Sequence, residues 1–271
     1  MTSKFILSAL IVSGSVLSQA GVWHYANDSA NDGSGGSFYE GYGLAYSAQG
    51  SKLIFAINSN FDPTGHALGG TLNGRISNGD MFLNFSGHNL DTASKFTDAN
   101  VFAIRFDSTN DDGVARVGLY SNITAAGYAT LNSGYGSLAQ YTGSGFGRTT
   151  NAMGDLQDNV NTGGDVRSYL GNSAMLPNIA AGTYVSGVTM LNSSDLSGMG
   201  MMTSGWSGLG SNIYGFSVDR SSLPKGAFVG HQFEECINDG MAIRGSSVPA
   251  PGAIATFVVG LLGAIRRRKS A

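Results

Sequence analysis

Short apolar or alternating runs, separated by turns rich in Gly, Asn, Asp and Ser, most strongly constrain the fold of this chain. Its 271 residues include 41 glycines, and almost no stretch has the period of a helix. Many short strands at near-regular spacing are typical of a β-sandwich. We therefore predict an all-β fold, a single β-sandwich of jelly-roll type. The expected strands cover residues 41–47, 52–58, 79–86, 99–107, 115–121, 182–190, 211–218, 226–233 and 241–244.

Three regions depart from this pattern. Residues 127–147 and 190–209 are of low complexity, which predicts extended surface loops that pack through a few aromatic or methionine side chains. Residues 149–158 and 165–175 are weak candidates for a turn or two of helix. Residues 52–58 and 101–107 carry large apolar side chains on both faces, as expected of central strands.

The charge balance restricts the partners that this protein can have. Five of the 15 Lys and Arg residues lie at positions 4 and 266–269, which leaves ten in residues 21–247 against all 18 Asp and Glu residues. The body is therefore acidic, with a formal net charge of −8. Because nucleic-acid binding requires a basic surface that neutralises phosphates, no nucleic-acid partner is expected.

The last two dozen residues fall into three segments of different composition. The 13 apolar residues 253–265 would span only about 20 Å as a helix, short of the roughly 20 residues that cross a bilayer comfortably. By the positive-inside rule, the basic cluster after them keeps the C-terminus in the cytoplasm. We therefore expect transient anchoring in the inner membrane, the alternative being a buried C-terminal helix. The flanking segments are the motif Val248, Pro249, Ala250, Pro251, Gly252 and the basic tail Arg266, Arg267, Arg268, Lys269.

The first twenty residues have the organisation of a secretory signal peptide. Lys4 provides the positive region, residues 5–17 the apolar region, and Ser18-Gln19-Ala20 a cleavage site before Gly21. The chain therefore divides into a signal peptide (1–20), a β-sandwich body (21–247) and a C-terminal signal (248–271). An exported protein with this body is expected at the cell surface or outside the cell.

Together the three C-terminal segments resemble the PEP-CTERM signal that exosortases read. Ala250 stands where the most familiar form of the motif has Glu, so the resemblance is to a Val-Pro-x-Pro-Gly variant. It implies that an exosortase-type sorting enzyme processes the chain at residues 248–252. It also implies delivery to the cell surface or the extracellular matrix.

Short parts of the body resemble exosortase-dependent surface proteins of otherwise unknown biochemical role. This second resemblance implies a location and not a reaction. It rests on Trp23-x-Tyr25-Ala26, on residues 79–87, on Ile104-Arg105-Phe106, and on the segment from Leu223 to Gly240 that contains Glu235-Cys236-x-Asn238-Asp239.

Asn and Asp residues beside Gly recur at the ends of the predicted strands. The densest group is Asp107, Asn110, Asp111 and Asp112, between two of those strands. Calcium prefers such oxygen ligands on loops, so these four residues are the candidate calcium ligands, and no other cofactor is expected. The alternative is a plain hairpin turn, because Asn and Asp tolerate positive φ and cap their own backbone.

Residues suited to catalysis are few and scattered. The only glutamates are Glu40, Glu234 and Glu235, and two adjacent residues on a strand point to opposite faces, so Glu234 and Glu235 cannot form a glycosidase pair by themselves. Cys236 is the single cysteine, which excludes an intrachain disulfide, and it is interpreted as a buried small hydrophobe. A nucleophilic role would require His231, its only local partner.

These observations predict an exported surface or matrix protein with a structural or adhesive role and no enzymatic activity. The first alternative is a carbohydrate-binding module, calcium-assisted or not, that contacts an extracellular polysaccharide. Aromatic residues near polar loops would suit it, because sugars stack on exposed rings. The second alternative is a secreted polysaccharide hydrolase.

Overall fold

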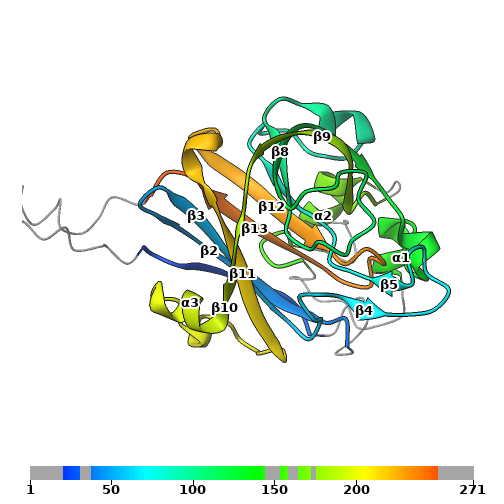
Figure 1. Cartoon of the computed structure of the whole chain (residues 1–271), viewed down its shortest axis with the longest axis horizontal. Helices are drawn as coiled ribbons and strands as arrows, with labels where there is room; N and C mark the ends of the chain where they lie inside the picture. Colours follow the sequence, from blue (N-terminus) through cyan, green and yellow to red (C-terminus); the bar gives the residue numbers. More distant parts are fainter. Residues whose placement is uncertain (1–20, 31–37, 144–152, 158–163, 172–174, 250–271) are drawn as a thin grey trace, which may run out of the picture.

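The computed structural model describes residues 21–30, 38–143, 153–157, 164–171 and 175–249. Thirteen strands in these residues form three antiparallel sheets, and the helices are short (Figure 1). The all-β prediction is therefore confirmed. The strands are β1 (His24–Asn27), β2 (Gly41–Gln49), β3 (Lys52–Ser59), β4 (His66–Ala67), β5 (Arg75–Ile76), β6 (Met81–Asn84), β7 (Val101–Arg105), β8 (Gly118–Ala126), β9 (Asn178–Ser186), β10 (Thr189–Asn192), β11 (Asn212–Asp219), β12 (Ala227–Phe233) and β13 (Gly240–Ser246). The α-helices are α1 (Leu138–Thr142), α2 (Gly164–Leu170) and α3 (Ser193–Gly198), with 3-10 turns at Ala93–Thr97, Ala129–Asn132, Thr203–Gly205 and Arg220–Ser222.

Two large sheets pack face to face. One has the strand order β1-β2-β3-β11-β10 and the other β13-β12-β6-β7-β8-β9, while β4 and β5 form a separate pair. Phe55 and Phe216 from the first sheet share a buried cluster with Ile104 and Ile243 from the second. The fold is thus sandwich-like, with its central core between the two sheets.

Both outer faces of the sandwich are also covered. In β3, Phe55 points into the central core, whereas Ile54 points outward to a cluster with Leu196 and Trp206 around α3. In β7, Ile104 points inward, and the alternate residues face a third cluster beneath α1 and α2. Apolar residues on both faces of these strands, as the sequence predicted, therefore reflect burial on both sides.

One predicted strand was wrong. Residues 182–190 belong to two strands, since β9 lies in the six-stranded sheet and β10 in the five-stranded sheet. The chain crosses between the sheets at Gly187 and Val188, directly after Ser186-Gly187, a turn-forming dipeptide that the prediction passed over. Helix α2 overlaps the predicted helical region 165–175 and begins one residue before it. Half of the other candidate, 149–158, lies outside the described residues, and its described half, residues 153–157, forms a turn with a bridge between Met153 and Leu156 where a helix was predicted.

The two ends of the sandwich differ in what they hold. At one end, here called the near end, β1 begins and β13 finishes beside Tyr46: the Ser246 amide donates to the Tyr46 hydroxyl over 3.1 Å, and the His24 and Tyr46 ring centroids are 5.7 Å apart. The opposite, far end contains the starts of β2, β6 and β13 and the end of β7. In Figure 1 the near end lies on the left, and β4, β5 and α1 lie on the right.

The predicted signal peptide (1–20), Ala250, Pro251, Gly252, the apolar run 253–265 and the basic tail Arg266 to Lys269 lie outside the described residues. In the part of the chain that the structure does describe, none of the helices has the length and apolar character needed to span a membrane.

Candidate functional site

The loop predicted to bind calcium folds around an arginine. Arg105, at the end of β7, is buried, and its guanidinium donates to the Asn110 Oδ1 over 2.8 Å and to the Asp107 carbonyl over 3.3 Å. It also donates to the Ser108 carbonyl over 3.2 Å and to the Val114 carbonyl. The loop oxygens therefore surround a fixed positive charge that the chain itself supplies.

The four candidate ligands have separate tasks around this arginine. Asp112 Oδ2 lies 3.3 Å from Arg105 Nε and its side chain is fully buried, so it is the counter-ion. Asp107 Oδ1 accepts from the Thr109 amide over 2.8 Å, which closes the start of the loop. Asp111 faces away, where its Oδ2 accepts from Asn132 Nδ2 over 2.9 Å. Asn110 and Asp112 thus meet at Arg105, whereas Asp111 does not join them.

Asp80, at the start of β6, joins this cluster although it lies far away in sequence. Its Oδ1 accepts from Asn110 Nδ2 over 3.1 Å and its Oδ2 from the Ile179 amide over 2.7 Å. Burial raises the pKa of Asp80 well above its ordinary value, and the neighbouring Asp112 raises that pKa further. Burial also raises the pKa of Asp112, but hydrogen bonds from Asp80 and Asn178 and the charge of Arg105 offset part of the rise. The proton of this pair therefore resides on Asp80, and Asp112 is the ionised partner of Arg105.

Glu235 forms hydrogen bonds with residues around this loop but does not contact the Arg105 guanidinium. Its carboxyl group accepts from the Ser77 amide over 3.1 Å, from Asn178 Nδ2 over 2.9 Å and from the Asp111 amide. Burial raises the pKa of Glu235 to about 8. We call Arg105, Asp80, Asn110, Asp112 and Asn178 the Arg105 cluster, and Glu235 lies at its edge.

A glycine lets this loop pack against β9. The Gly113 amide donates to the Ile179 carbonyl over 2.8 Å, and a Cβ at position 113 would lie 1.9 Å from the Ala180 carbonyl oxygen. Any side chain here would push the loop away from β9. The sequence signal for the site was therefore the Asp-Asp-Gly turn, whereas Asp80, Arg105 and Asn178 come from other strands and gave no local signal.

A second buried carboxyl pair lies in the turn between β12 and β13. Asp239 accepts from the Gly41 amide over 2.6 Å, from the Tyr141 hydroxyl over 2.8 Å and from the Gly240 amide over 2.7 Å, and Glu234 Oε2 accepts from the Asp239 amide over 3.0 Å. Burial raises the pKa of both carboxyl groups well above their ordinary values, and like charge raises them further, Asp239 acting on Glu234 and Glu40 on Asp239. In the described residues, Glu234 and Asp239 form no ion pair with Lys, Arg or His.

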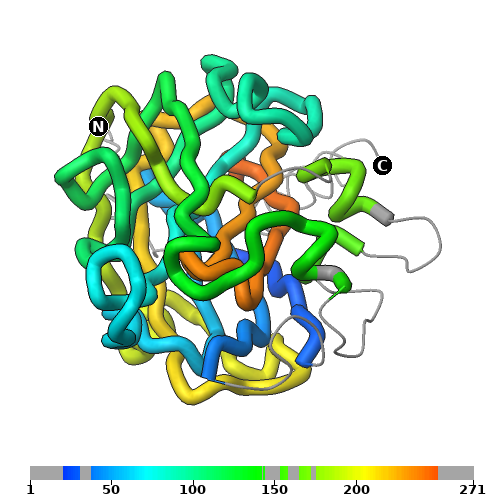
Figure 2. The backbone as a smooth tube through the Cα atoms, turned by 90° about the vertical axis from the view of Figure 1, so that its right-hand side faces the viewer, coloured from blue at the N-terminus to red at the C-terminus, as the bar shows by residue number. Residues whose placement is uncertain are grey.

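Residues 127–143, the described part of the segment predicted to be a surface loop (127–147), cover this turn. The Tyr135 amide donates to the Cys236 carbonyl over 2.8 Å, and Tyr141 is buried. Figure 2, which views the molecule from its far end, shows this green segment lying across the orange turn. Glu234 and Glu235 follow the end of β12, where they contact different clusters, and both are buried.

Cys236 and His231 belong to separate clusters. Cys236 packs with Phe61 and Ile76, and burial raises the pKa of its thiol well above the ordinary value. His231 lies beneath α2, its ring stacked on Phe82 at 5.3 Å, and burial lowers its pKa to about 3. A buried small hydrophobe therefore describes Cys236, as predicted, and His231 is a neutral core residue.

The buried carboxyl groups of the far end connect several strands and loops through hydrogen bonds. Among the residues that the structure describes, no three His, Cys, Asp or Glu side chains are arranged to hold a metal. Calcium binding at Asp107, Asn110, Asp111 and Asp112 stays a prediction. A cation there would have to share the oxygens that now contact Arg105.

The chain leaves the folded body at the near end through one anchored residue. The Ser247 amide donates to the Gly226 carbonyl over 2.9 Å, its hydroxyl donates to the Pro224 carbonyl over 2.6 Å, and its own carbonyl accepts from Arg220 over 2.9 Å. Ser247 is buried, whereas Val248, the first residue of the predicted sorting motif, is 49% exposed. Ser247 is therefore anchored to the body, and the side chain that follows it is open to solvent.

Comparison of the chain with protein-family models, with curated proteins and with solved structures found no match.

Proposed function

We propose that this protein is an exported, exosortase-processed surface or matrix protein with a structural or adhesive role and no enzymatic activity. The observation that carries the proposal is the boundary at the near end. Ser247 is held by backbone and side-chain hydrogen bonds to Gly226, Pro224 and Arg220, and Val248, where the motif begins, is 49% exposed. A processing enzyme needs an extended, accessible segment, and Pro249 and Pro251 favour one.

The arrangement of the two chain ends supports the same proposal. The body begins and finishes beside Tyr46, so an N-terminal signal peptide and a C-terminal membrane segment would both be attached at the near end. In that arrangement the near end faces the inner membrane before processing, with the basic tail in the cytoplasm. The far end, with its buried carboxyl groups, then points away from the bilayer.

A non-enzymatic role accounts for the carboxyl groups better than hydrolysis does. A glycosidase needs two carboxyl groups facing each other across a cleft that admits substrate. Glu40, Glu234 and Glu235 are all buried and take part in holding the far end together. We propose that the body acts as a stable sandwich, of jelly-roll connectivity as the sequence pattern predicted, and not as a catalyst.

The sorting motif provides the test. The double variant Pro249→Ala, Pro251→Ala should accumulate as a membrane-retained precursor in a Gram-negative host that carries an exosortase. Pro63→Ala, which changes a turn at the far end, is the matched control and should be processed normally. Mass spectrometry of the mature C-terminus distinguishes the outcomes. An identical mature C-terminus in the double variant and the wild type would refute the sorting proposal.

A further inference from the structure

A groove of about 320 Å³ lies on the outer face of the six-stranded sheet, at its near end. Its floor is a row of residues in register across three strands: Arg244 of β13 pairs with Val229 of β12, and Val229 pairs with Asn84 of β6. Asp165 and Tyr169 of α2 form one wall, and the loop with His88 forms the other. The volume falls within the roughly 300–1,000 Å³ of small-molecule sites.

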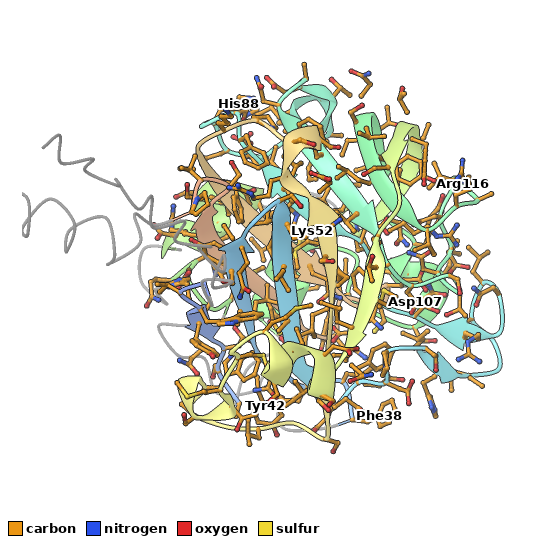
Figure 3. All side chains as sticks on the ribbon, turned by 60° about the vertical axis from the view of Figure 1, so that its left-hand side comes forward. Phe38, Tyr42, Lys52, His88, Asp107 and Arg116 are labelled. Atoms are coloured by element: carbon orange, nitrogen blue, oxygen red, sulfur yellow. The ribbon has the colours of Figure 1, made fainter. Side chains whose placement is uncertain are left out.

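The groove is separate from the Arg105 cluster and from the pair Glu234 and Asp239 at the far end. His88 and Asp107 lie well apart in Figure 3. The Arg244 and Asp165 side chains are each 53% exposed, so the groove is open to solvent along that side. It can therefore admit part of a long molecule as well as a small one.

The charges that line the groove are paired. Arg244 Nη2 lies 3.3 Å from Asp165 Oδ2, and His88 Nε2 lies 3.1 Å from Asp98 Oδ2. An anionic ligand would need a net positive lining, and a cationic ligand a net negative one. Paired charges instead present donors and acceptors side by side, which suits a neutral ligand whose hydroxyl groups both donate and accept.

A buried hydroxyl group points to a polar ligand independently of these charges. Tyr169 is buried and packs edge-on against His231, and its hydroxyl lies near Asn84 and Arg244. Asn84 is close enough to lower the pKa of this hydroxyl through a weak side-chain contact, but the oxygen has no hydrogen-bond partner of ordinary geometry among the described residues. Because buried polar groups are nearly always paired, a hydroxyl left over in the wall of a groove is suited to a ligand group.

We propose that this groove binds a neutral saccharide chain. Arg244, Asp165 and the Tyr169 hydroxyl hydrogen-bond to the sugar hydroxyls, while Val229 contacts the carbon–hydrogen face of a ring. Binding of this kind is independent of sorting at residues 248–252, so either proposal can fail without the other.

The test is titration calorimetry of the full-length chain with oligosaccharides of matched length. A polyoxyethylene detergent is used, because a detergent with a sugar headgroup would compete. The probes are the neutral hexasaccharides of glucose, xylose and mannose, with hexagalacturonate as the anionic and hexaglucosamine as the cationic comparison. At least one neutral probe should bind with a Kd below about 1 mM and more tightly than either charged probe. Failure of every neutral probe to bind, or tighter binding of a charged probe, overturns the proposal.

Two variants test whether the saccharide binds in this groove. Tyr169→Phe removes only the unpaired hydroxyl and keeps the ring against His231, so it should weaken binding about threefold to tenfold without lowering the melting temperature. Arg244→Ala should weaken binding by about tenfold or more. Arg116→Ala changes an exposed arginine elsewhere, stacked on Tyr184, and should leave binding unchanged. Unchanged binding in both groove variants, or an equal loss in Arg116→Ala, would place the ligand elsewhere and overturn the proposal.

Discussion

The far end holds two sets of buried acidic residues, the Arg105 cluster and the pair Glu234 and Asp239. The negative charge is compensated differently in each set. In the Arg105 cluster, a guanidinium compensates Asp112, and only Asp80 has to keep a proton. In the pair Glu234 and Asp239, backbone amides and the Tyr141 hydroxyl are the donors, and like charge raises the pKa of both groups. The Arg105 guanidinium stabilises the first set, and protons bound to the carboxyl groups stabilise Glu234 and Asp239.

This difference shows that an acidic turn does not by itself reveal its ionisation state. Asp111-Asp112-Gly113 and Asn238-Asp239-Gly240 look alike in the sequence. Asp112 lies 3.3 Å from an arginine of the neighbouring strand, whereas Asp239 has no such neighbour in the described residues. The two acidic groups should therefore respond differently to substitution, to pH and to calcium.

Loss of the Arg105 guanidinium should have the largest effect on the free energy of unfolding. Arg105→Met removes the donors to the loop carbonyls and leaves Asp112 buried without its counter-ion. Breaking a buried pair in this way should lower the free energy of unfolding by about 3–5 kcal/mol. The measurement is urea unfolding of the full-length chain in non-ionic detergent. The control Arg116→Met, at an exposed arginine, should stay within about 0.5 kcal/mol of the wild type, and a similarly small loss in Arg105→Met would contradict the role of the cation.

The proton-stabilised groups should make the protein less stable at high pH. The pKa of Glu235 is raised from 4.5 to about 8, so the folded state binds its proton more tightly than the unfolded state does. Its contribution is complete below pH 4.5 and is lost as the pH rises to about 8, by up to about 1.4 kcal/mol for each pH unit. Glu234, Asp239 and Asp80 act in the same direction.

Thermal melts between pH 4.5 and 8.5 test this dependence. Glu235→Gln should make the melting temperature fall less steeply with rising pH, because the amide has no proton to lose. Asp91→Asn, which changes an exposed carboxylate paired with Lys95, should leave the slope unchanged. A stability that rises with pH across this window would show that these carboxyl groups are ionised in the folded protein.

Amide substitutions compare the two acidic groups directly. Asp112→Asn leaves the Arg105 guanidinium without its carboxylate and should cost about 2–3 kcal/mol. Glu234→Gln replaces a carboxyl group whose raised pKa favours its neutral form, so it should cost less than about 1 kcal/mol. Equilibrium unfolding of both variants at pH 7 gives the comparison. Equal losses would mean that both acidic groups are charged, or that both are neutral.

Added calcium should have the smallest effect on the melting temperature. Because Arg105 already supplies a positive charge to Asn110 and Asp112, added calcium has few free ligands in this loop. Melting temperatures in millimolar calcium and in chelator should differ by less than a few degrees. A bound ion would instead add roughly 2.7 kcal/mol at a hundredfold excess over its Kd. A large rise that Asp111→Ala abolishes would therefore identify a calcium site.

Much of the fold could be predicted from residue patterns, but little of the candidate site. Short apolar or alternating runs located β2, β3, β11 and β12, but the break between β9 and β10 was missed, although Ser186-Gly187 is a turn-forming dipeptide there. Helix α3 had a signal that could have been found, since Asn192 and Asp195 form a capping box at its start. Asp107 to Asp112 were identified as a group, but not the arginine they surround.

The sequence by itself determined the all-β pattern, the acidic body and the composition of its two end segments, because these depend on periodicity, charge and local order along the chain. Only the tertiary structure decided which strands become neighbours, and therefore that Asp80, Arg105 and Asn178 meet around one loop. Local patterns specify which face a side chain takes, but not what lies opposite. The charge of a buried acid depends on that neighbour and on its loss of water, and both appear only when the strands pack.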